Sequence, residues 1–201
     1  MSDDELNLFD NDDEGEEVWT PIDVGQGVTI ELQPQLCQIW GSAMNLARWV
    51  AAHPSVIRGQ SVVELGAAAG LPCLVATTVG AAASLGTDVD ANGVDRMKTA
   101  ASRNGLEQIM RAEKLDWFEY LGSRPPDRAT VDVVLAADVN YSSKTVDALL
   151  STIRSLLGPQ GTLLLASRAQ RFGLCETLAR LPASADVRLA SAYIFDDDGD
   201  W

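Results

Sequence analysis

The residues best suited to chemistry in this sequence are a turn of small residues and an acid placed after the next apolar segment. The turn, Gly-Ala-Ala-Ala-Gly at residues 66–70, directly follows an apolar run at 62–65. Small residues in such a turn let backbone N–H groups approach a bound ligand. A second short apolar segment ends on Gly86-Thr87-Asp88, and a carboxylate at that place can hold the two hydroxyls of a ribose. The pattern predicts a nucleoside-binding β-turn-α-β unit, with a ligand-free strand and turn as the alternative.

The spacing of the small residues indicates which nucleoside fits. The dinucleotide fingerprint needs G-x-G-x-x-G, whereas the small positions here are Gly66, Ala68 and Gly70, and no Gly-Lys-Ser/Thr of a Walker loop follows. S-Adenosylmethionine carries an adenosine without phosphate and therefore tolerates a looser turn. Residues 64–70 resemble the first motif of the class I methyltransferases, E-L-G-x-G-x-G, with Ala68 in place of the middle glycine. A loop that carries no pyrophosphate can accept this additional methyl group.

Strands and helices alternate along the rest of the chain and would position these residues. We expect strands over 28–30, 60–65, 83–87, 111–115, 131–137, 162–167 and 187–195, and helices over 38–50, 71–79, 92–104, 144–157 and 171–181, with a turn at 158–161. The segment 131–137 is apolar nearly throughout, which is typical of a parallel strand buried on both faces. The sequence thus predicts an α/β fold of the Rossmann-like type, a mostly parallel sheet with helices on both faces.

The candidate residues all fall at one edge of this predicted sheet. Ligands of open parallel sheets bind at the carboxyl ends of the strands. Gly66, Asp88, the pair Asp116-Trp117 and Asp138 each directly follow a predicted strand or end it. This coincidence predicts a binding site at that edge.

Charge and composition limit the possible functions. The 201-residue chain, 46% of it hydrophobic, is long enough for one domain with a substantial core. Its formal charge of −14 argues against a nucleic-acid groove, which needs a basic surface. Nine of its 29 acids and none of its bases lie in residues 1–17. We therefore expect a disordered acidic tail over 1–17 and one domain over 18–201.

The sequence shows no targeting pattern and no metal-binding pattern. The acidic N-terminus lacks the basic region of a signal peptide, and the apolar runs are too short or too interrupted to span a bilayer. Cys37, Cys73 and Cys175 are widely spaced, and His53 is the single histidine. This distribution argues against a metal site and fits a reducing compartment. We expect a monomer in the cytoplasm, with the nucleus as an alternative, that binds neither nucleic acid nor membrane.

Taken together, these motifs resemble the seven-strand methyltransferases of the family-16 type. Most members of that group methylate lysine residues of non-histone proteins such as chaperones and translation factors. The match runs from about residue 38 to residue 171. It includes Ile39-Trp40, the loop at 64–70, Asp88, Leu-Asp-Trp at 115–117, Ala-Ala-Asp-Val-Asn-Tyr at 136–141 and residues 163–168. The D-x-x-Y run that marks the group is intact from Asp138 to Tyr141.

The resemblance implies a cofactor, S-adenosyl-L-methionine, a protein substrate, and a set of site residues. Glu64, at the end of its strand, is expected to help hold the ammonium group of the cofactor. Asp138 and Tyr141 are expected to be catalytic, orienting first the ammonium group and then the amine of the substrate lysine. Cofactor contacts in this group fall on the positions of Trp40, Gly66, Ala67, Ala68, Asp88, Trp117 and Ala137.

Two features depart from the pattern of the group. Residues 66–72 resemble the branch that methylates the N-terminus and a nearby lysine of elongation factor 1A, whereas 138–141 and Ser167-Arg168 resemble the lysine-specific branch. The sheet of the group normally finishes with an antiparallel hairpin. Here a single predicted strand precedes an acidic end, so we expect the C-terminal hairpin to be incomplete.

Several alternatives stay open. A protein N-terminal or small-molecule N-methyltransferase is the nearest of them, and a non-catalytic adaptor with a methyltransferase fold belongs to another class. A nucleic-acid methyltransferase is disfavoured because the Asn-Pro-Pro-Tyr type of run that holds a flipped base is absent. The altered glycine spacing disfavours a dehydrogenase.

Overall fold

The alternating apolar runs form one parallel sheet, and the order of its strands creates the site. The computed structural model describes residues 18–33, 39, 41–121, 129–140, 142–181 and 193–195. The sheet has the strand order β5-β4-β3-β6-β7-β8, and each described pairing in it is parallel. Its strands are β3 (Ser61–Leu65), β4 (Ala83–Asp88), β5 (Met110–Lys114), β6 (Val131–Ala137), β7 (Leu157–Arg168) and β8 (Tyr193–Phe195).

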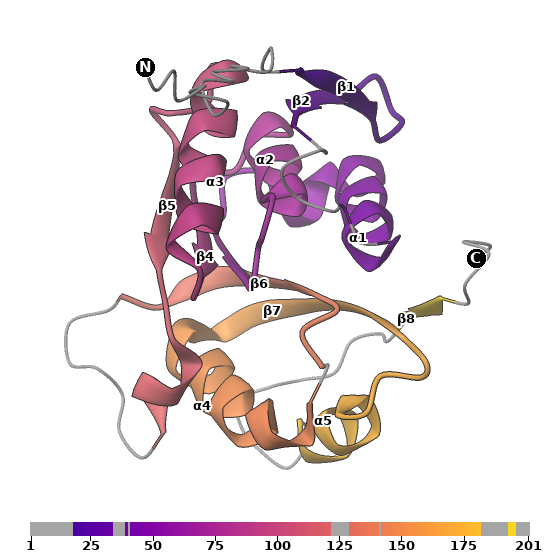
Figure 1. The fold of residues 1–201 in the computed structure, drawn as a ribbon, viewed down its shortest axis with the longest axis vertical. Helices are drawn as coiled ribbons and strands as arrows, with labels where there is room; N and C mark the ends of the chain where they lie inside the picture. Colours follow the sequence, from indigo (N-terminus) through magenta and orange to yellow (C-terminus); the bar gives the residue numbers. More distant parts are fainter. Residues whose placement is uncertain are drawn as a thin grey trace, which may run out of the picture.

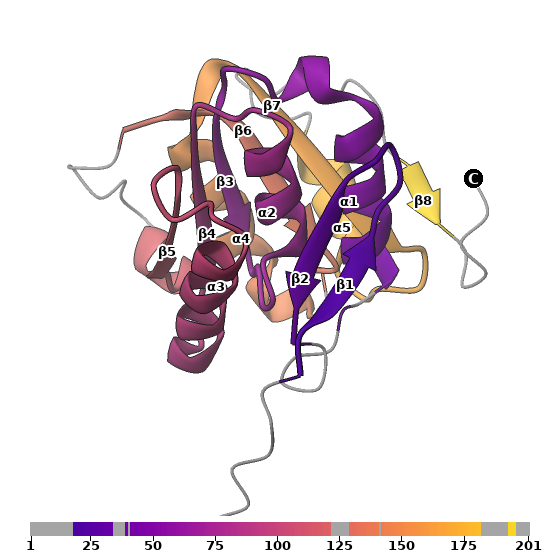
Figure 2. The same ribbon diagram turned by 90° about the horizontal axis from the view of Figure 1, so that it is seen from above.

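Helices cover both faces of this sheet (Figures 1 and 2). Helices α1 (Gly41–Ala52), α2 (Leu71–Thr78) and α3 (Ala91–Arg103) lie on one face. Helices α4 (Val146–Leu156) and α5 (Leu174–Arg180) lie on the other. Short 3₁₀ helices complete the described chain: η1 (Pro54–Val56), η2 (Trp117–Tyr120) and η3 (Ser143–Thr145).

The central strand β6 contributes to a separate hydrophobic core on each face. Val133 and Leu135 pack into the core under α1, α2 and α3, whereas Val134 and Ala136 pack into the core under α4. Successive side chains of a strand point to opposite faces, so an apolar strand of this kind must be covered on both sides. A small antiparallel hairpin, β1 (Thr20–Asp23) and β2 (Thr29–Leu32), extends the first core with Ile30.

Helix α3 approaches the sheet closely because glycines leave room for one methionine. A Cβ atom added to Gly86 of β4 would lie 2.5 Å from the sulfur of Met97, and one added to Gly70 would lie 2.9 Å from its Cγ. Met97 is completely buried. The glycines therefore fix the distance between α3 and the turn that ends at Gly70.

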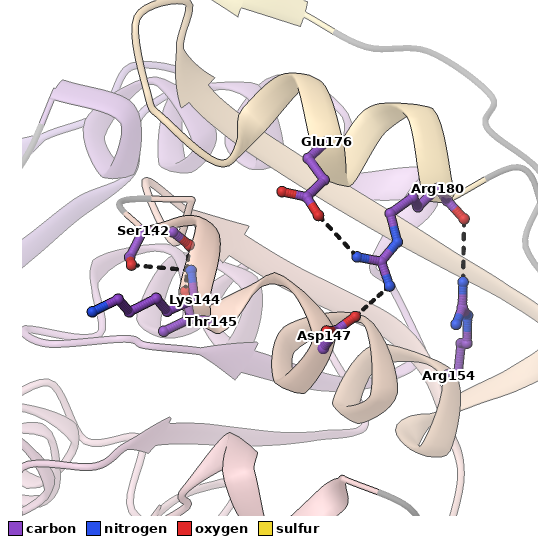
Figure 3. A network of polar contacts seen from close by, with 7 residues as sticks. All are labelled: Ser142, Lys144, Thr145, Asp147, Arg154, Glu176 and Arg180. Carbon is purple, nitrogen blue, oxygen red and sulfur yellow. Dashed lines mark hydrogen bonds and ion pairs between the residues drawn. The ribbon is translucent and has the colours of Figure 1, made fainter.

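Polar contacts join α4 to α5 on the opposite face (Figure 3). The Arg180 guanidinium pairs with Asp147 of α4 and, at 3.1 Å, with Glu176 of its own helix. Arg154 of α4 donates a hydrogen bond to the carbonyl oxygen of Arg180 at 3.1 Å. In this way α5, a helix of only seven residues, is held against α4.

The predicted fold class is confirmed, and most elements begin and end within a few residues of their predicted bounds. The strand at 131–137 is observed with its predicted bounds. One prediction is wrong: residues 158–161 are not a turn before the strand but part of β7. There the pairing with β6 shifts from Val131↔Leu157 to Val133↔Thr162, so the extra residues form a bulge. The helix predicted from residue 144 begins as η3, which leads directly into α4 at Val146.

The described end of the sheet carries no antiparallel hairpin. Strand β8 pairs with β7 in parallel, through Ala166↔Tyr193, Ser167↔Ile194 and Arg168↔Phe195. The predicted acidic tail at 1–17 and most of the predicted strand at 187–195 lie outside the described residues. None of the helices in the described ranges is long and apolar enough to cross a membrane.

Candidate active site

The site lies where the strand order of the sheet reverses. From β3 the chain proceeds outward to β4 and β5, and then returns to the other side of β3 as β6. Loops that leave neighbouring strands in opposite directions open a crevice between them, which is where ligands of such sheets bind. A pocket of about 410 Å³ occupies this place. Within the described part of the chain it is lined by Gly66, Ala68, Asp88, Val89, Leu115, Asp116, Trp117, Phe118, Ala137, Asp138, Val139, Thr145 and Arg171.

The turn after β3 owes its shape to left-handed backbone conformations. Gly66 has φ +62°, Ala68 has φ +49° and Gly70 has φ +73°. A Cβ atom on Gly66 would lie 3.3 Å from both Trp117 and Val139, two residues that line the pocket. Glycine at this position therefore keeps the pocket open as well as permitting the turn.

Asp88 holds the turn in place from the end of β4. Its Oδ2 accepts a hydrogen bond from the Ala68 amide at 2.9 Å, and its Oδ1 accepts one from the Asp90 amide at 3.0 Å. Each carboxylate oxygen has further acceptor capacity. Asp88 lines the pocket, so this remaining capacity is available to the hydroxyls of a ligand.

Glu64 lies beneath the turn and does not line the pocket. Its side chain is buried, and its Oε2 accepts a hydrogen bond from the Cys73 amide at 2.8 Å, in the first turn of α2. Burial, with a smaller contribution from the charge of Asp88, raises the pKa of Glu64 to about 8 against the opposing effect of that hydrogen bond. The structure therefore places Glu64 as a support for α2 rather than as part of the pocket wall.

An aromatic wall follows β5. Asp116 begins η2 by accepting a hydrogen bond from the Phe118 amide at 2.9 Å. This cap positions Trp117 and Phe118 along the pocket, beside Leu115 and Val89. Phe118 remains 52% exposed and Val89 56% exposed. The wall offers a flat apolar surface suited to a purine ring.

Asp138 stands at the other end of the pocket, after β6, in a left-handed conformation with φ +58°. Its amide donates a hydrogen bond to the Ala166 carbonyl oxygen at 2.8 Å, which ties the loop to β7. Its carboxylate is 5% exposed and pairs with Arg171. Burial alone would raise the pKa of this carboxyl. The hydrogen bonds from Arg171 and the Arg168 amide, with the charge of Arg171, outweigh burial and hold the pKa below its ordinary value.

The structure gathers most, but not all, of the residues predicted from the sequence. Gly66, Ala68, Asp88, Trp117, Ala137 and Asp138 line one pocket. Ala67 is buried beside it and donates its amide to the Thr87 carbonyl oxygen at 2.8 Å. Trp40 and Tyr141 lie outside the described residues. The roles assigned to all of these residues remain predictions.

Several of the lining residues are not among those predicted from the sequence. Val89 and Phe118 directly follow predicted ones, so adjacency in the chain was a usable signal. Arg171 gave no comparable signal, because its partner Asp138 lies 33 residues earlier.

Comparison with known proteins agrees with this geometry. A family model described as "Lysine methyltransferase" matches residues 31–176, which is most of the chain. The chain belongs to the lysine methyltransferase family. Its matched region contains the turn after β3, Asp88, the aromatic wall and the Asp138 loop.

Individual relatives are similar to the chain over the same region. The "Protein N-terminal and lysine N-methyltransferase EFM7" of Eremothecium gossypii is 33% identical over 150 residues, covering 69% of this chain and 57% of the relative. The mouse "EEF1A lysine methyltransferase 3" is 28% identical, covering 76% of this chain and 65% of the relative. The chain thus spans less than two thirds of the length of either protein.

A solved structure shows the same fold. The ribosomal protein L11 methylase from Lactobacillus delbrueckii superposes with a TM-score of 0.62 at 17% identity, over 80% of this chain and 87% of that one. At this identity the likeness supports the fold alone.

Proposed function

We propose that this chain is an S-adenosylmethionine-dependent N-methyltransferase that modifies a lysine side chain of a non-histone protein. The observation that carries the proposal is the arrangement of a single pocket. Asp88 and an apolar aromatic wall lie at one end, and a buried carboxylate, Asp138, lies at the other. The first end suits a nucleoside and the second suits a basic nitrogen. Membership of the lysine methyltransferase family supports the same reading.

The residues present fit this cofactor. A pocket of about 410 Å³ is within the range of small-molecule sites. Asp88 would accept hydrogen bonds from the ribose hydroxyls, and Leu115, Trp117 and Phe118 would contact the adenine. Gly66 has no side chain between its backbone and the pocket that it lines, which leaves this backbone within reach of the ligand. Bound S-adenosylmethionine supplies a methyl group on a positively charged sulfur.

The protein's remaining task is to present a neutral amine. With a reference pKa near 10.4, only about one lysine in a few thousand is neutral at pH 7. Methyl transfer is an in-line displacement, so catalysis rests mainly on positioning. Asp138 would orient the substrate nitrogen, and the walls formed by Val139 and Trp117 would limit access of water.

Elongation factor 1A is the first substrate to test, because the mouse relative is named for it. A second candidate activity, methylation of the α-amino group of the substrate, is favoured by the name of the relative that is 33% identical. We include in the proposal a monomeric state and a cytoplasmic location, which size-exclusion chromatography with light scattering and fluorescence microscopy would check.

The test is transfer to a defined protein. Purified chain, S-adenosylmethionine and recombinant elongation factor 1A are incubated, and tryptic peptides are analysed for methyl groups on lysine or on the N-terminus. Asp138→Asn is the informative variant, because asparagine preserves the shape and accepts the left-handed conformation of this position. Its matched control is Asp95→Asn, an exposed acid of α3.

We expect lysine methylation by the wild type and by Asp95→Asn, and a large loss with Asp138→Asn. A mark on the N-terminus would favour the second activity. A folded wild type that binds S-adenosylmethionine but transfers no methyl group to any protein of a lysate would contradict the proposal and favour an adaptor.

A further inference from the structure

The carboxylate expected to meet the substrate nitrogen is already engaged by an arginine. Arg171 lies in the turn between β7 and α5, lines the pocket, and reaches back to Asp138 at the end of β6. Its Nε donates to Oδ1 of Asp138 at 2.9 Å, and its Nη2 donates to Oδ2. A guanidinium that binds both oxygens of a carboxylate fixes the plane of that carboxylate.

A second arginine approaches the same group. The Arg168 amide donates to Oδ1 of Asp138 at 3.4 Å, and the Nε of Arg168 lies 3.6 Å from Oδ2. Of the three side chains, Asp138 is 5% exposed, Arg171 26% and Arg168 39%. The Ser42 hydroxyl of α1 makes the smallest contribution to the low pKa of Asp138. Asp88 and Asp116, at the far end of the pocket, are the other acids that line it in the described chain.

The turn that carries Arg171 is fixed by its own backbone. The Arg171 amide donates to the Arg168 carbonyl oxygen at 3.2 Å, and the Leu174 amide donates to that of Arg171 at 3.1 Å. The Gly173 amide donates to the Asn140 carbonyl oxygen at 3.2 Å, which joins the turn to the loop after β6. The side chain of Arg171 takes no part in these three backbone contacts, so a substitution at this position leaves them in place.

The charges at this end of the pocket favour a neutral acceptor. A lone buried carboxylate would bind a lysine as its ammonium ion and would raise the pKa of that ammonium. Two guanidinium groups beside the carboxylate offset its negative charge. Offsetting that charge weakens the preference for the ammonium ion and so favours the uncharged amine, which is the form that can attack a methyl group.

We propose that Arg171 is a positioning residue of the acceptor site. It fixes the Asp138 carboxylate in one orientation, keeps it ionised, and balances its charge so that the substrate nitrogen is bound as an amine. This inference rests on the proposed function, because it assigns Arg171 a part in presenting the acceptor nitrogen.

The experiment compares Arg171→Gln and Arg171→Lys with the wild type. Arg154→Gln, an arginine of α4 that contacts the Arg180 carbonyl oxygen, is the matched control outside the pocket. The first readout is the titration of the Asp138 carboxyl carbon by NMR in protein labelled with ¹³C-aspartate, with Asp138→Asn identifying the signal. The second is the pH dependence of kcat and KM with recombinant elongation factor 1A. Calorimetry with S-adenosylmethionine monitors the cofactor end.

In Arg171→Gln we expect the pKa of Asp138 to rise by at least about one unit, because burial is then opposed by fewer partners. The affinity for S-adenosylmethionine should stay within about threefold, and kcat should fall about 10- to 100-fold, as expected for a misplaced reactant. The acid limb of the pH profile should move to higher pH. Arg171→Lys should restore the titration of Asp138 and part of kcat, since lysine keeps the charge but not the two-point contact.

Three results would overturn the inference. The first is an Asp138 titration in Arg171→Gln that equals that of the wild type. The second is a rise in kcat, which would make Arg171 an obstacle to the acceptor. The third is a shift of the Asp138 titration without any change in the pH profile of catalysis. The NMR titration needs no substrate. A wild type that transfers no methyl group, but whose Asp138 titration depends on Arg171, would therefore contradict the proposed function without contradicting the interaction between Arg171 and Asp138.

Discussion

Substitutions at two nearby positions of the turn after β3 should have opposite effects on stability. Gly66 and Ala68 both have left-handed backbone conformations, at φ +62° and +49°. A non-glycine residue in that region costs about 1–2 kcal/mol. Gly66→Ala introduces this strain, whereas Ala68→Gly removes it. Replacing glycine by alanine also reduces the conformational entropy of the unfolded chain, which stabilises the fold by about 0.4–1 kcal/mol, and the reverse replacement destabilises it by the same amount. This effect opposes the effect of the strain.

Crowding adds to the destabilisation expected for Gly66→Ala. The new methyl group of Gly66→Ala would lie 3.3 Å from Trp117 and from Val139, so both pocket walls must shift by a few tenths of an ångström. We expect Gly66→Ala to destabilise the fold by about 1–2 kcal/mol, and Ala68→Gly to stabilise it by about 0.5–1 kcal/mol. For a domain of this size these changes correspond to a fall of roughly 2–8 °C and a rise of roughly 1–4 °C in Tm.

Thermal unfolding followed by circular dichroism measures both variants, and calorimetry measures their affinity for S-adenosylmethionine. Gly66→Ala should also weaken that affinity, because the wall formed by Trp117 moves, whereas Ala68→Gly should preserve it. A Gly66→Ala variant with unchanged Tm would contradict this expectation. So would an Ala68→Gly variant that is less stable than the wild type, as an ordinary alanine-to-glycine change would be.

Two further predictions concern buried groups. Because the folded pKa of Glu64 is about 8 and its ordinary value is 4.5, the folded protein keeps a proton between these pH values that the unfolded chain releases. The free energy of unfolding therefore falls as pH rises through that window, by at most about 1.4 kcal/mol per pH unit. Urea unfolding at pH 5 and pH 8 should show a smaller fall in stability for Glu64→Gln than for the wild type. An equal fall in both proteins would argue against a raised pKa of Glu64. Gly86→Ala should lower the free energy of unfolding by about 1–3 kcal/mol, because its methyl group meets Met97. Met97→Ala should be less destabilising in the Gly86→Ala background than in the wild type. Strictly additive effects would show that Met97 moves aside freely.

The sequence predicted the sheet well where local and long-range preferences agree. Residues 131–137 are apolar apart from Asp132 because most of the strand is buried on both faces, and this pattern is readable from the chain alone. The bulge at 158–161 was not predictable from turn-forming residues, because pairing with β6 at Val131 draws Leu157 into the strand. Long-range pairing prevailed there over local propensity.

The site residues that could be predicted from the sequence are those that directly follow a strand. Gly66, Asp88 and Asp138 follow strands, and parallel strands bring their carboxyl ends together. The side-chain direction of Glu64 was not predictable, because a strand end can point an acid to the ligand or to the adjacent helix. The pairing of Arg171 with Asp138 depends on how the turn after β7 docks onto the loop after β6, which no local pattern encodes.

We infer that the pocket at the carboxyl ends of β3, β4 and β6 binds S-adenosylmethionine. Calorimetric titration of the purified chain tests it directly, with Asp88→Ala as the variant and Asp95→Ala, an exposed acid of α3, as the matched control. Loss of two charge-assisted hydrogen bonds at about 1.5–3 kcal/mol each predicts a weakening of about 100-fold or more for Asp88→Ala. We expect micromolar binding by the wild type and by Asp95→Ala, and loss of this binding in Asp88→Ala. A folded wild type without binding, or an Asp88→Ala variant that binds as tightly as the wild type, would contradict it.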